Sequence, residues 1–329
     1  MTLTIQYNCV QLQKNSKILS YAKVNSSQLH DEFVLIKVHF SNYNNKDLLV
    51  AKGQEGSRRS YPHTIGLDAA GEVVESRSSS FKSGDLVAVM ATQAGISMAG
   101  GYSEYLMVPA SSISRIPETF TTREAMLFGT AGLTAALAVK TLISNPNVDK
   151  NKPVLVTGGS SGVGVVSAIL LKLYGFKVTA STSNDGAARF LRSIGVDHVM
   201  NRIQNPRSNS FALLPEKWGG CIDIIGGPGL SMILKSISQG GKIISVGSLA
   251  GDRLEINLNP FYLRGVNLVG INSESLTNLE RSKLLSEFLT KDLSSILDEI
   301  SLEHNLDQVP KLMMNHYFGS NFGRHLIKI

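Results

Sequence analysis

Glycines and serines are concentrated between Gly158 and Gly164, after the apolar stretch Val154–Thr157 and before the amphipathic stretch Val163–Tyr174. The spacing is not a regular G-x-G-x-x-G, but a strand before it and a helix after it are the context in which such a turn binds a dinucleotide. The N–H groups at a helix N-terminus attract a pyrophosphate, and glycine lets the backbone approach it closely. We therefore expect phosphate binding by Gly159, Ser160, Ser161, Gly162 and Val163. The alternative is a tight strand-to-helix turn that binds nothing.

The residues that follow the next predicted strand, Lys177–Ser181, bear on the choice of cofactor. A carboxylate here would bind the ribose hydroxyls of NAD, but Thr182, Ser183 and Asn184 are neutral. Asp185 lies beyond them, where we expect it to stabilise the N-terminus of a helix. Small neutral residues leave room for a 2′-phosphate, so we expect NADPH. The cation that pairs with this phosphate would be Lys177, Arg189 or Arg202.

The composition excludes several classes of protein. The chain has 329 residues, of which 43% are hydrophobic, and a net charge of +6 without a long basic block. We expect about two domains that attract small anions and do not bind nucleic acid. The longest uncharged stretch, Pro153–Leu171, contains the glycine turn, so we expect no membrane span. The N-terminus has no secretory pattern, and two cysteines, Cys9 and Cys221, suit a reducing compartment, so we expect a cytoplasmic protein.

The elements that must position the glycine turn alternate along residues 122–273. The predicted strands are Val154–Gly158, Lys177–Ser181, Asp197–Met200, Cys221–Gly226, Lys242–Gly247 and Val266–Ile271, and the predicted helices lie near Val163–Tyr174, Asp185–Ser193 and Leu230–Ser238. Strands that alternate with helices across short loops are typical of an α/β protein with a doubly wound parallel sheet, a Rossmann domain.

The flanking segments predict a second, β-rich domain. Residues 1–121 contain short strands without long helices, such as Glu32–Ser41, Asp68–Glu75 and Gly84–Ala91. Thr121 and Glu124 have the spacing of a capping box, which predicts that a helix begins there. Residues 274–329 read as a helix or two and a strand that return to the first domain, which makes that domain discontinuous.

A series of motifs resembles one known family over nearly the whole chain. They include "SNYNNKD" from Ser41, "IGLDAAGEV" from Ile65, "GTAGLTA" from Gly129, "GGPGL" from Gly226 and "GRHLIKI" from Gly323. Their order and spacing resemble the medium-chain dehydrogenase/reductase superfamily, in its zinc-free quinone oxidoreductase section, and especially its acrylyl-CoA reductase group. The resemblance implies a GroES-like catalytic domain, an inserted Rossmann domain and an active cleft between them. It also implies a homodimer that pairs through the strand in Val266–Asn272.

The resemblance implies roles for individual residues. Asn44 and Asp47 match polar residues near the nicotinamide and the substrate, but Asn and Asp also fix turns. Thr130 matches a threonine that contacts the nicotinamide; alternatively it is a small residue where a helix packs on the sheet. Further cofactor contacts are implied for Val246, Gly247, Ser248 and Arg324.

Substrate contacts are expected from Phe261 and Arg264, with a packed ring and a surface salt bridge as the alternative. The departures from the group's pattern are Asn45, Ile65 and Ala99, which replace a tyrosine, a proline and a tryptophan. Tyr43 is a candidate to replace the missing tyrosine, so we expect Tyr43 and Asn45 near the substrate. The pair Arg58–Arg59 is expected in a solvated loop that would also suit an anionic CoA tail.

The residues indicate chemistry without a metal ion. Zinc-dependent members carry a His-Glu pair where this chain has Leu67 and Asp68, and His63 stands alone, so we expect no metal site. When hydride adds to a double bond conjugated to a carbonyl, charge collects on the carbonyl oxygen, where hydrogen-bond donors stabilise it. Together with the absent zinc ligands, the resemblance therefore implies transfer of hydride from NADPH to an acrylyl-CoA-like, enoyl or enone substrate. The alternatives are an NADPH:quinone oxidoreductase and, less favoured, a non-enzymatic NADPH-binding protein.

Overall fold

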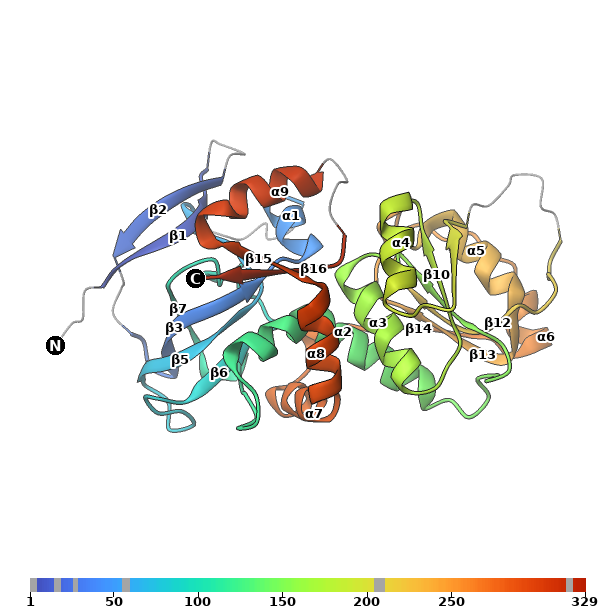
Figure 1. Cartoon of the computed structure of the whole chain (residues 1–329), viewed down its shortest axis with the longest axis horizontal. Coiled ribbons are helices and arrows are strands. Elements are labelled where there is room, and N and C mark those ends of the chain that lie inside the picture. The colour runs from blue at the N-terminus through green and yellow to red at the C-terminus, as the bar shows by residue number, and fades with distance from the viewer. Residues whose placement is uncertain (1–4, 15–18, 26–28, 55–59, 204–210, 318–321) are drawn as a thin grey trace. The chain divides into compact units, whose positions relative to one another are not determined.

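The computed structural model describes residues 5–14, 19–25, 29–54, 60–203, 211–317 and 322–329. The chain forms two compact units (Figure 1). Unit 1 comprises Met1–Leu133 and Ser273–Ile329, and unit 2 comprises Thr134–Asn272. Unit 1 is therefore discontinuous, and the chain enters unit 2 within helix α2 (Thr122–Ile143).

Unit 1 is built from two sheets. Among its described residues, one sheet has the order β2–β1–β4, and a seven-stranded sheet has the order β15–β16–β3–β5–β6–β8, with β7 paired to β3. The strands are β1 (Gln6–Leu12), β2 (Leu19–Asn25), β3 (Phe33–Asn42), β4 (His63–Thr64), β5 (Ala69–Ser76), β6 (Leu86–Val89), β7 (Tyr105–Pro109), β8 (Ile113–Arg115), β15 (Ser301–Asn305) and β16 (Arg324–Lys328). Its helices besides α2 are α1 (Asn45–Ala51), α7 (Asn278–Phe288), α8 (Lys291–Ile300) and α9 (Val309–Tyr317). The β-rich first domain and the return of the C-terminal segment agree with the sequence.

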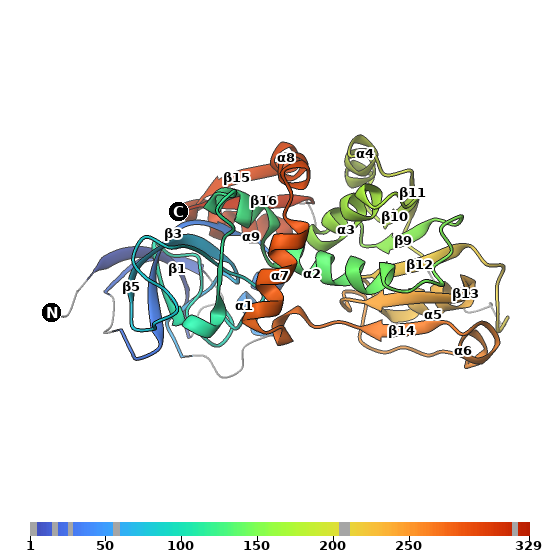
Figure 2. The ribbon, with the colours of Figure 1, turned by 90° about the horizontal axis from the view of Figure 1, so that it is seen from below.

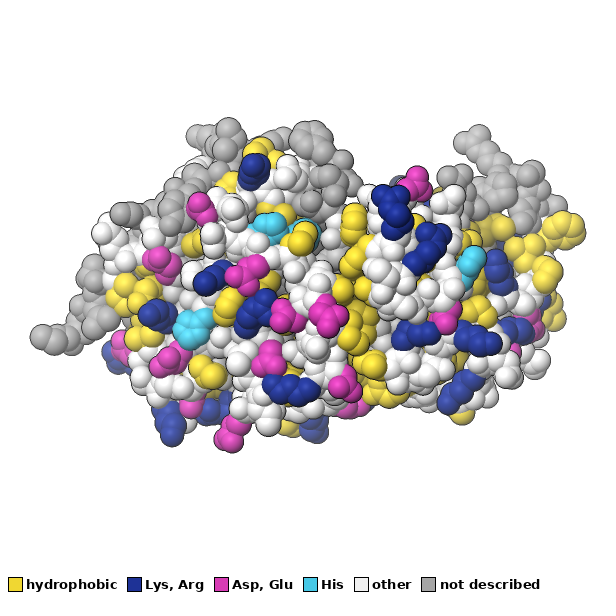
Figure 3. Space-filling view, viewed as in Figure 1, with side chains coloured by type: hydrophobic (Ala, Val, Ile, Leu, Met, Phe, Trp, Pro, Cys, Tyr) yellow, Lys and Arg dark blue, Asp and Glu magenta, His cyan; other side chains and the backbone are white. Residues whose placement is uncertain are grey.

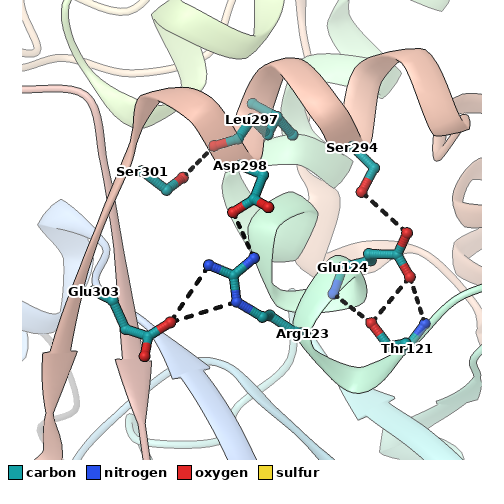
Figure 4. Close-up of polar contacts among 8 residues, drawn as sticks. All are labelled: Thr121, Arg123, Glu124, Ser294, Leu297, Asp298, Ser301 and Glu303. Atoms are coloured by element: carbon teal, nitrogen blue, oxygen red, sulfur yellow. Dashed lines mark hydrogen bonds and ion pairs between the residues drawn. The ribbon is translucent and has the colours of Figure 1, made fainter.

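The first half of α2 belongs to unit 1, so the boundary lies twelve residues beyond the predicted residue 121. Figure 4 shows contacts that hold the start of α2 in unit 1: Arg123 donates to Asp298 of α8 at 2.5 Å and pairs with Glu303 of β15 at 3.4 Å. The predicted capping box is present, since Glu124 accepts from the Thr121 N–H at 2.8 Å. These contacts fix the start of the helix to the C-terminal segment of the same unit.

Unit 2 contains a six-stranded parallel sheet with the order β11–β10–β9–β12–β13–β14. The strands are β9 (Val154–Thr157), β10 (Val178–Thr182), β11 (His198–Asn201), β12 (Trp218–Asp223), β13 (Ile237–Ser245) and β14 (Asn267–Gly270), and the helices are α3 (Gly162–Leu173), α4 (Asp185–Ser193), α5 (Gly227–Ser236) and α6 (Asn259–Arg264). Helices α3 and α4 cover one face of the sheet and α5 covers the other (Figure 2). The predicted doubly wound sheet is confirmed.

The direction of winding reverses between β9 and β12. From β9 the chain moves outward through β10 and β11, and it then returns to β12 and moves the other way through β13 and β14. In such sheets a ligand binds at the carboxyl ends of the strands where the order reverses. The strand order of unit 2 therefore places the glycine turn, which follows β9, at the carboxyl ends of the strands where the winding reverses.

Helix α2 is long and apolar enough, by length and composition alone, to cross a membrane. However, 72% of the relevant stretch is buried inside the structure. Burial of this kind is typical of a core helix.

Candidate functional site

The glycine turn of unit 2 is shaped by close packing. Gly158 has a φ of +59°, and the Gly159 N–H donates to the Ser181 carbonyl of β10 at 3.0 Å. A Cβ at Gly159 would lie 2.7 Å from that of Ala180, and one at Gly164 would collide with the Gly158 carbonyl oxygen. Ser161 caps α3 by accepting from the Gly164 N–H at 3.1 Å. The glycines thus allow α3 to begin directly against the sheet, as a pyrophosphate-binding turn requires.

The end of β10 lies beside this turn and carries no charge. The hydroxyls of Ser160 and Thr182 are hydrogen-bonded at 3.1 Å. Ser183 is exposed, and Asn184 caps α4 by accepting from the Ala187 N–H at 3.0 Å. Asp185 follows in the first turn of α4. The predicted residues 182–184 are therefore grouped next to residues 159–163.

A small hollow lies at the carboxyl ends of the central strands of unit 2. Its lining includes Thr157 of β9, Ser181 of β10, Asp223 of β12 and Arg202. Asp223 is buried and accepts from the Thr157 hydroxyl at 2.5 Å and from the Gly226 N–H at 2.9 Å. Burial raises the pKa of Asp223, while the charge of Arg202 lowers it. Arg202 is therefore a candidate cation whose contacts place it at this edge.

The other two candidate cations lie elsewhere in unit 2. Lys177 precedes β10, and its carbonyl accepts from the N–H of Val154, the first residue of β9. It therefore lies at the amino end of the strands, and its assignment to the 2′-phosphate is not supported. Arg189 is an exposed residue of α4, over which basic side chains gather (Figure 3).

Residues 246–248 lie at the same edge as the hollow. The Val246 N–H donates to the Asp223 carbonyl at 2.8 Å. A Cβ at Gly247 would lie 2.9 Å from the Ile224 carbonyl oxygen, and one at Gly226 would lie 3.1 Å from the Ser248 Cα. Val246, Gly247 and Ser248 thus follow β13 where the winding reverses, as a cofactor contact requires.

The structure corrects the placement of Phe261 and Arg264. Arg264 donates to the carbonyls of Leu214 at 2.7 Å and Lys235 at 2.9 Å, which precede β12 and β13. These residues lie at the amino end of the sheet, so Arg264 is at the opposite edge from the glycine turn. Phe261 packs on the core of unit 2, and Arg264 pairs with Glu216 at 3.7 Å. The alternative of a packed ring and a salt bridge agrees with these contacts.

In unit 1, two buried carboxylates hold Asn44 at the start of α1. The Asn44 N–H donates to Asp47 at 2.8 Å, and its side-chain amide donates to Asp68 at 2.9 Å. Asp47 also accepts from the Leu67 N–H at 2.8 Å and the Tyr102 hydroxyl at 2.9 Å, and it is completely buried. These contacts favour the alternative in which Asp47 fixes the turn. Asn44 itself is only half-buried.

Asp68 also holds Thr130. The Thr130 hydroxyl donates to Asp68 Oδ1 at 2.5 Å, its N–H donates to Oδ2 at 3.0 Å, and the Ala91 N–H donates to the same hydroxyl at 2.6 Å. Ala91 has a φ of +51°, an uncommon conformation for a residue with a side chain. Asn44 and Thr130, both predicted site residues, are therefore brought together by one carboxylate that the sequence did not identify. In the sequence, Asp68 appeared only as a member of the motif that begins at Ile65, and it lies between apolar residues just before β5.

Arg324 lies in the same region of unit 1. Its guanidinium is buried and donates to the carbonyls of Leu127 at 3.1 Å and Phe128 at 3.0 Å. Burial lowers the pKa of Arg324 to about 10, while the charge of Asp68 acts in the opposite direction. These contacts favour a structural role for Arg324 over the predicted cofactor contact.

The candidate substrate residues of unit 1 differ in exposure. Tyr43 is buried, with its ring edge against His325, and burial raises the pKa of its hydroxyl. Asn45 is half-buried at the first position of α1. Ile65 is buried in the core, whereas Ala99 is exposed. The pair Arg58–Arg59 lies outside the described residues.

Within the part of the chain that the structure describes, no three His, Cys, Asp or Glu residues are grouped so that they could hold a metal ion. His63 is buried, with Nε2 at 3.0 Å from the Gly95 carbonyl.

Two family models match the chain. The GroES-like domain of alcohol dehydrogenases matches residues 30–118, and the zinc-binding dehydrogenase model matches residues 162–290. The chain is 35% identical to YhfP of Bacillus subtilis, which is named as a quinone oxidoreductase, over 95% of this chain and 97% of that protein. It is 38% identical to the acrylyl-CoA reductase AcuI of Ruegeria pomeroyi, over 73% of both proteins.

Solved structures show the same fold. YhfP with NAD bound superposes with a TM-score of 0.90 at 34% identity, covering 99% of this chain and all of that one. The YhdH oxidoreductase of Salmonella enterica in complex with NADP superposes with a TM-score of 0.88 at 28% identity, covering 98% of this chain and 99% of that one. The predicted combination of a GroES-like and a Rossmann domain is confirmed.

Proposed function

Because the chain belongs to the medium-chain dehydrogenase/reductase superfamily, in its quinone oxidoreductase and acrylyl-CoA reductase group, we propose that it is an NADPH-dependent reductase of activated carbon–carbon double bonds. Its substrate is acrylyl-CoA or a related enoyl or enone compound. Similarity to an acrylyl-CoA reductase supports this substrate class, and the YhdH complex with NADP supports the cofactor.

The observation that carries the proposal is the uncharged end of β10 beside the glycine turn. Thr182 is bonded to Ser160 of the turn, and Ser183 is exposed next to it. A carboxylate in this place would repel a 2′-phosphate, whereas these residues leave room for it. Because the relative YhfP was solved with NAD, the preference for NADPH must be measured for this chain.

When bound, NADPH supplies the hydride, and the residues of the chain bind and orient the cofactor and the substrate. The N–H groups at the start of α3 bind the pyrophosphate, and residues 246–248 hold the carboxamide side of the nicotinamide. Asn44 uses one amide N–H to bond Asp68. We assign its second amide N–H to the carbonyl oxygen of the substrate, where negative charge collects during the reaction.

A quinone is the second candidate substrate. The exposed Ala99 and the half-buried Asn45 stand where the acrylyl-CoA group carries aromatic rings, so this chain has more room there. The relative YhfP is named as a quinone oxidoreductase. Both substrates would use the same cofactor residues.

Initial rates of NADPH oxidation with acrylyl-CoA, crotonyl-CoA, an enone and a quinone in parallel test the proposal. The same series is run with NADH and with a chelator. Saturable turnover of an enoyl-CoA or enone that a chelator does not change is the expected result. A preference for the quinone would select the second candidate. NADPH binding without turnover of any acceptor would contradict both and favour a non-enzymatic NADPH-binding protein.

We also propose a homodimer in the cytoplasm. Strand β14 is the edge of the six-stranded sheet, and its residues are exposed or half-buried. The edge N–H and C=O groups can pair with the same strand of a second copy. Cys9 and Cys221 are free thiols, which suits a reducing compartment. Light scattering during gel filtration tests the dimer, and Leu268→Pro in β14 should shift the mass to that of a monomer. The Ile271 N–H donates to the Ser245 carbonyl of β13, so by alternation along the strand the N–H of Leu268 points away from β13, toward the free edge.

A further inference from the structure

Glu274 joins two segments of unit 1 that lie far apart in the sequence. It belongs to the 3-10 helix η2 (Ser273–Ser275), with which the chain returns from unit 2 to unit 1. Its Oε1 forms an ion pair with Nζ of Lys46 in α1, and its Oε2 accepts from Nε2 of Gln93 at 3.0 Å. Gln93 lies between β6 and β7. One carboxylate therefore joins residues that are 228 and 181 positions away from it.

Gln93 also closes the turn that it begins. Its Oε1 accepts from the Ser97 hydroxyl at 3.2 Å, and its main-chain carbonyl accepts from the N–H groups of Ile96 at 3.1 Å and Met98 at 3.2 Å. The amide oxygen of Gln93 is thus bonded within the turn, and its amide nitrogen is bonded to Glu274. This side chain therefore links the whole turn to Glu274.

The two joined segments carry positions at which this chain departs from the acrylyl-CoA reductase pattern. Asn45 is half-buried in the first turn of α1, and Ala99 is exposed just after the turn of Gln93. The next residue packs against the third such position, since a Cβ at Gly100 would lie 2.4 Å from the carbonyl carbon of Ile65. The bridging carboxylate therefore fixes the spacing between segments that differ from the group.

We propose that Glu274 is a positioning residue for the acceptor, which acts through Lys46 and Gln93 and holds both segments in place before the acceptor binds. This step rests on the proposed function, because Asn45 and Ala99 are related to the acceptor only by resemblance. With 30% of the Lys46 side chain and 21% of the Glu274 side chain exposed, the ion pair adds little to the free energy of unfolding. Loosened segments, in contrast, must be ordered when an acceptor binds, which lowers its affinity.

The first test is kinetic and uses the acceptor that the protein turns over. Glu274→Ala should raise KM for this acceptor about threefold to tenfold, the cost of ordering a few side chains. The bound acceptor restores the arrangement, so kcat should stay within twofold of the wild type, and KM for NADPH should do the same. Lys291→Ala breaks another lysine–glutamate pair of unit 1, with Glu124 at 2.6 Å, and should keep the wild-type KM.

A double-mutant cycle tests whether Lys46 acts through Glu274. Lys46→Met alone should raise KM for the acceptor, whereas the double variant Lys46→Met/Glu274→Ala should have the KM of Glu274→Ala. If Glu274→Ala does not fold, Glu274→Gln takes its place in the cycle. This variant keeps an acceptor for Gln93 and loses the charge beside Lys46, so its KM should rise by the same factor as that of Lys46→Met.

Hydrogen exchange measured by mass spectrometry tests the link itself and needs no acceptor. The amides of Ile96 and Met98 are bonded to the Gln93 carbonyl, and in Glu274→Ala they should exchange about threefold faster or more, because the turn opens more often. In Lys291→Ala they should exchange at the wild-type rate. The midpoint of urea unfolding should be that of the wild type in both variants, which separates local opening from a loss of global stability.

The proposal is overturned if Glu274→Ala keeps the wild-type KM for the acceptor, or if the two fold-changes multiply in the double variant. It is also overturned if the amides of Ile96 and Met98 exchange at the wild-type rate in Glu274→Ala. A protein that reduces an enone with NADPH but gives any of these results loses this inference and keeps its proposed function. Faster exchange in a protein that turns over no acceptor would instead contradict the proposed function and support the link through Glu274.

Discussion

Arg324 and Asp68 stabilise opposite sides of the same kink in α2. Gly129 has non-helical angles within this helix, with a φ of +55°. Arg324 donates to the carbonyls that precede Gly129, including those of Leu127 and Phe128, and Asp68 accepts from the N–H of Thr130, which follows it. The two buried charges therefore satisfy backbone groups that the kink removes from the helix.

Replacement of Arg324 should affect folding more than cofactor binding. Arg324→Met leaves buried carbonyls without a donor and Asp68 without its nearby positive charge. The free energy of unfolding in urea should fall by about 3 kcal/mol or more. Arg115→Met, which removes an exposed arginine paired with Asp85, is the control and should cost less than about 1 kcal/mol. Unchanged stability with lost NADPH binding would restore the predicted cofactor role of Arg324.

A charge at the start of α3 should prevent cofactor binding. Gly162→Asp puts a carboxylate where the pyrophosphate is expected, and repulsion of about 3 kcal/mol would weaken NADPH binding at least about a hundredfold. Fluorescence titration with NADPH measures this, with Gly162→Asn as a control of equal size and no charge. If folded Gly162→Asp bound NADPH like the wild type, the pyrophosphate would have to bind elsewhere.

Elements with a regular pattern were predictable from the sequence. Helix α4 spans the predicted Asp185–Ser193, because a polar cap precedes it and its apolar residues recur on one face. Strand β9 follows from a short apolar run before a turn, and β10 from a short run of β-branched and small residues between turns. The glycine turn could also be placed, since its conformation depends on local context alone.

Residues whose role depends on distant partners could not be assigned in this way. Asp68 contacts Asn44 and Thr130, which lie 24 and 62 positions away in the chain. The residues near Asp68 in the sequence do not predict these contacts. The predicted substrate contact of Arg264 was wrong for a related reason. The order of motifs along the chain does not predict which end of the sheet a helix lies at.

Arg202 should select between the two nicotinamide cofactors. It lines the hollow beside Asp223 at the binding edge, where a charge-assisted bond to the 2′-phosphate is worth about 1.5–3 kcal/mol. Arg202→Gln should lower kcat/KM for NADPH about tenfold to a hundredfold and leave that for NADH unchanged. Arg189→Gln, which removes an exposed cation from α4, is the matched control. If only Arg189→Gln lost the preference for NADPH over NADH, the 2′-phosphate would be bound over α4.

Arg264 should stabilise unit 2 without contributing to substrate affinity. Its hydrogen bonds to the Leu214 and Lys235 carbonyls hold the segments that lead into β12 and β13. Arg264→Met should lower the free energy of unfolding by about 2 kcal/mol, and KM for the acceptor should remain within twofold of the wild type. A raised KM for CoA substrates at unchanged stability would return Arg264 to the substrate site.

Asp47 should make the stability of the protein depend on pH near neutrality. Burial raises the pKa of Asp47 to about 7, and the charge of Asp68 adds to this, against the hydrogen bonds from Asn44, Tyr102 and Leu67. In the unfolded chain the pKa is about 3.9. Between these values the folded state binds the proton more strongly than the unfolded state, so stability falls as the pH rises toward 7.

Asp47→Asn removes this titration and supplies the comparison. Both proteins are unfolded in urea at pH 5, 6, 7 and 8. The free energy of unfolding of the variant should rise relative to that of the wild type as the pH rises to 7, by at most about 1.4 kcal/mol per pH unit. Above pH 7 the difference should level off, because Asp47 is then ionised in both states. Parallel profiles would mean that Asp47 does not titrate in this range. If the wild type became more stable relative to the variant as the pH rises, the hydrogen bonds from Leu67, Asn44 and Tyr102 would outweigh the cost of burying the charge.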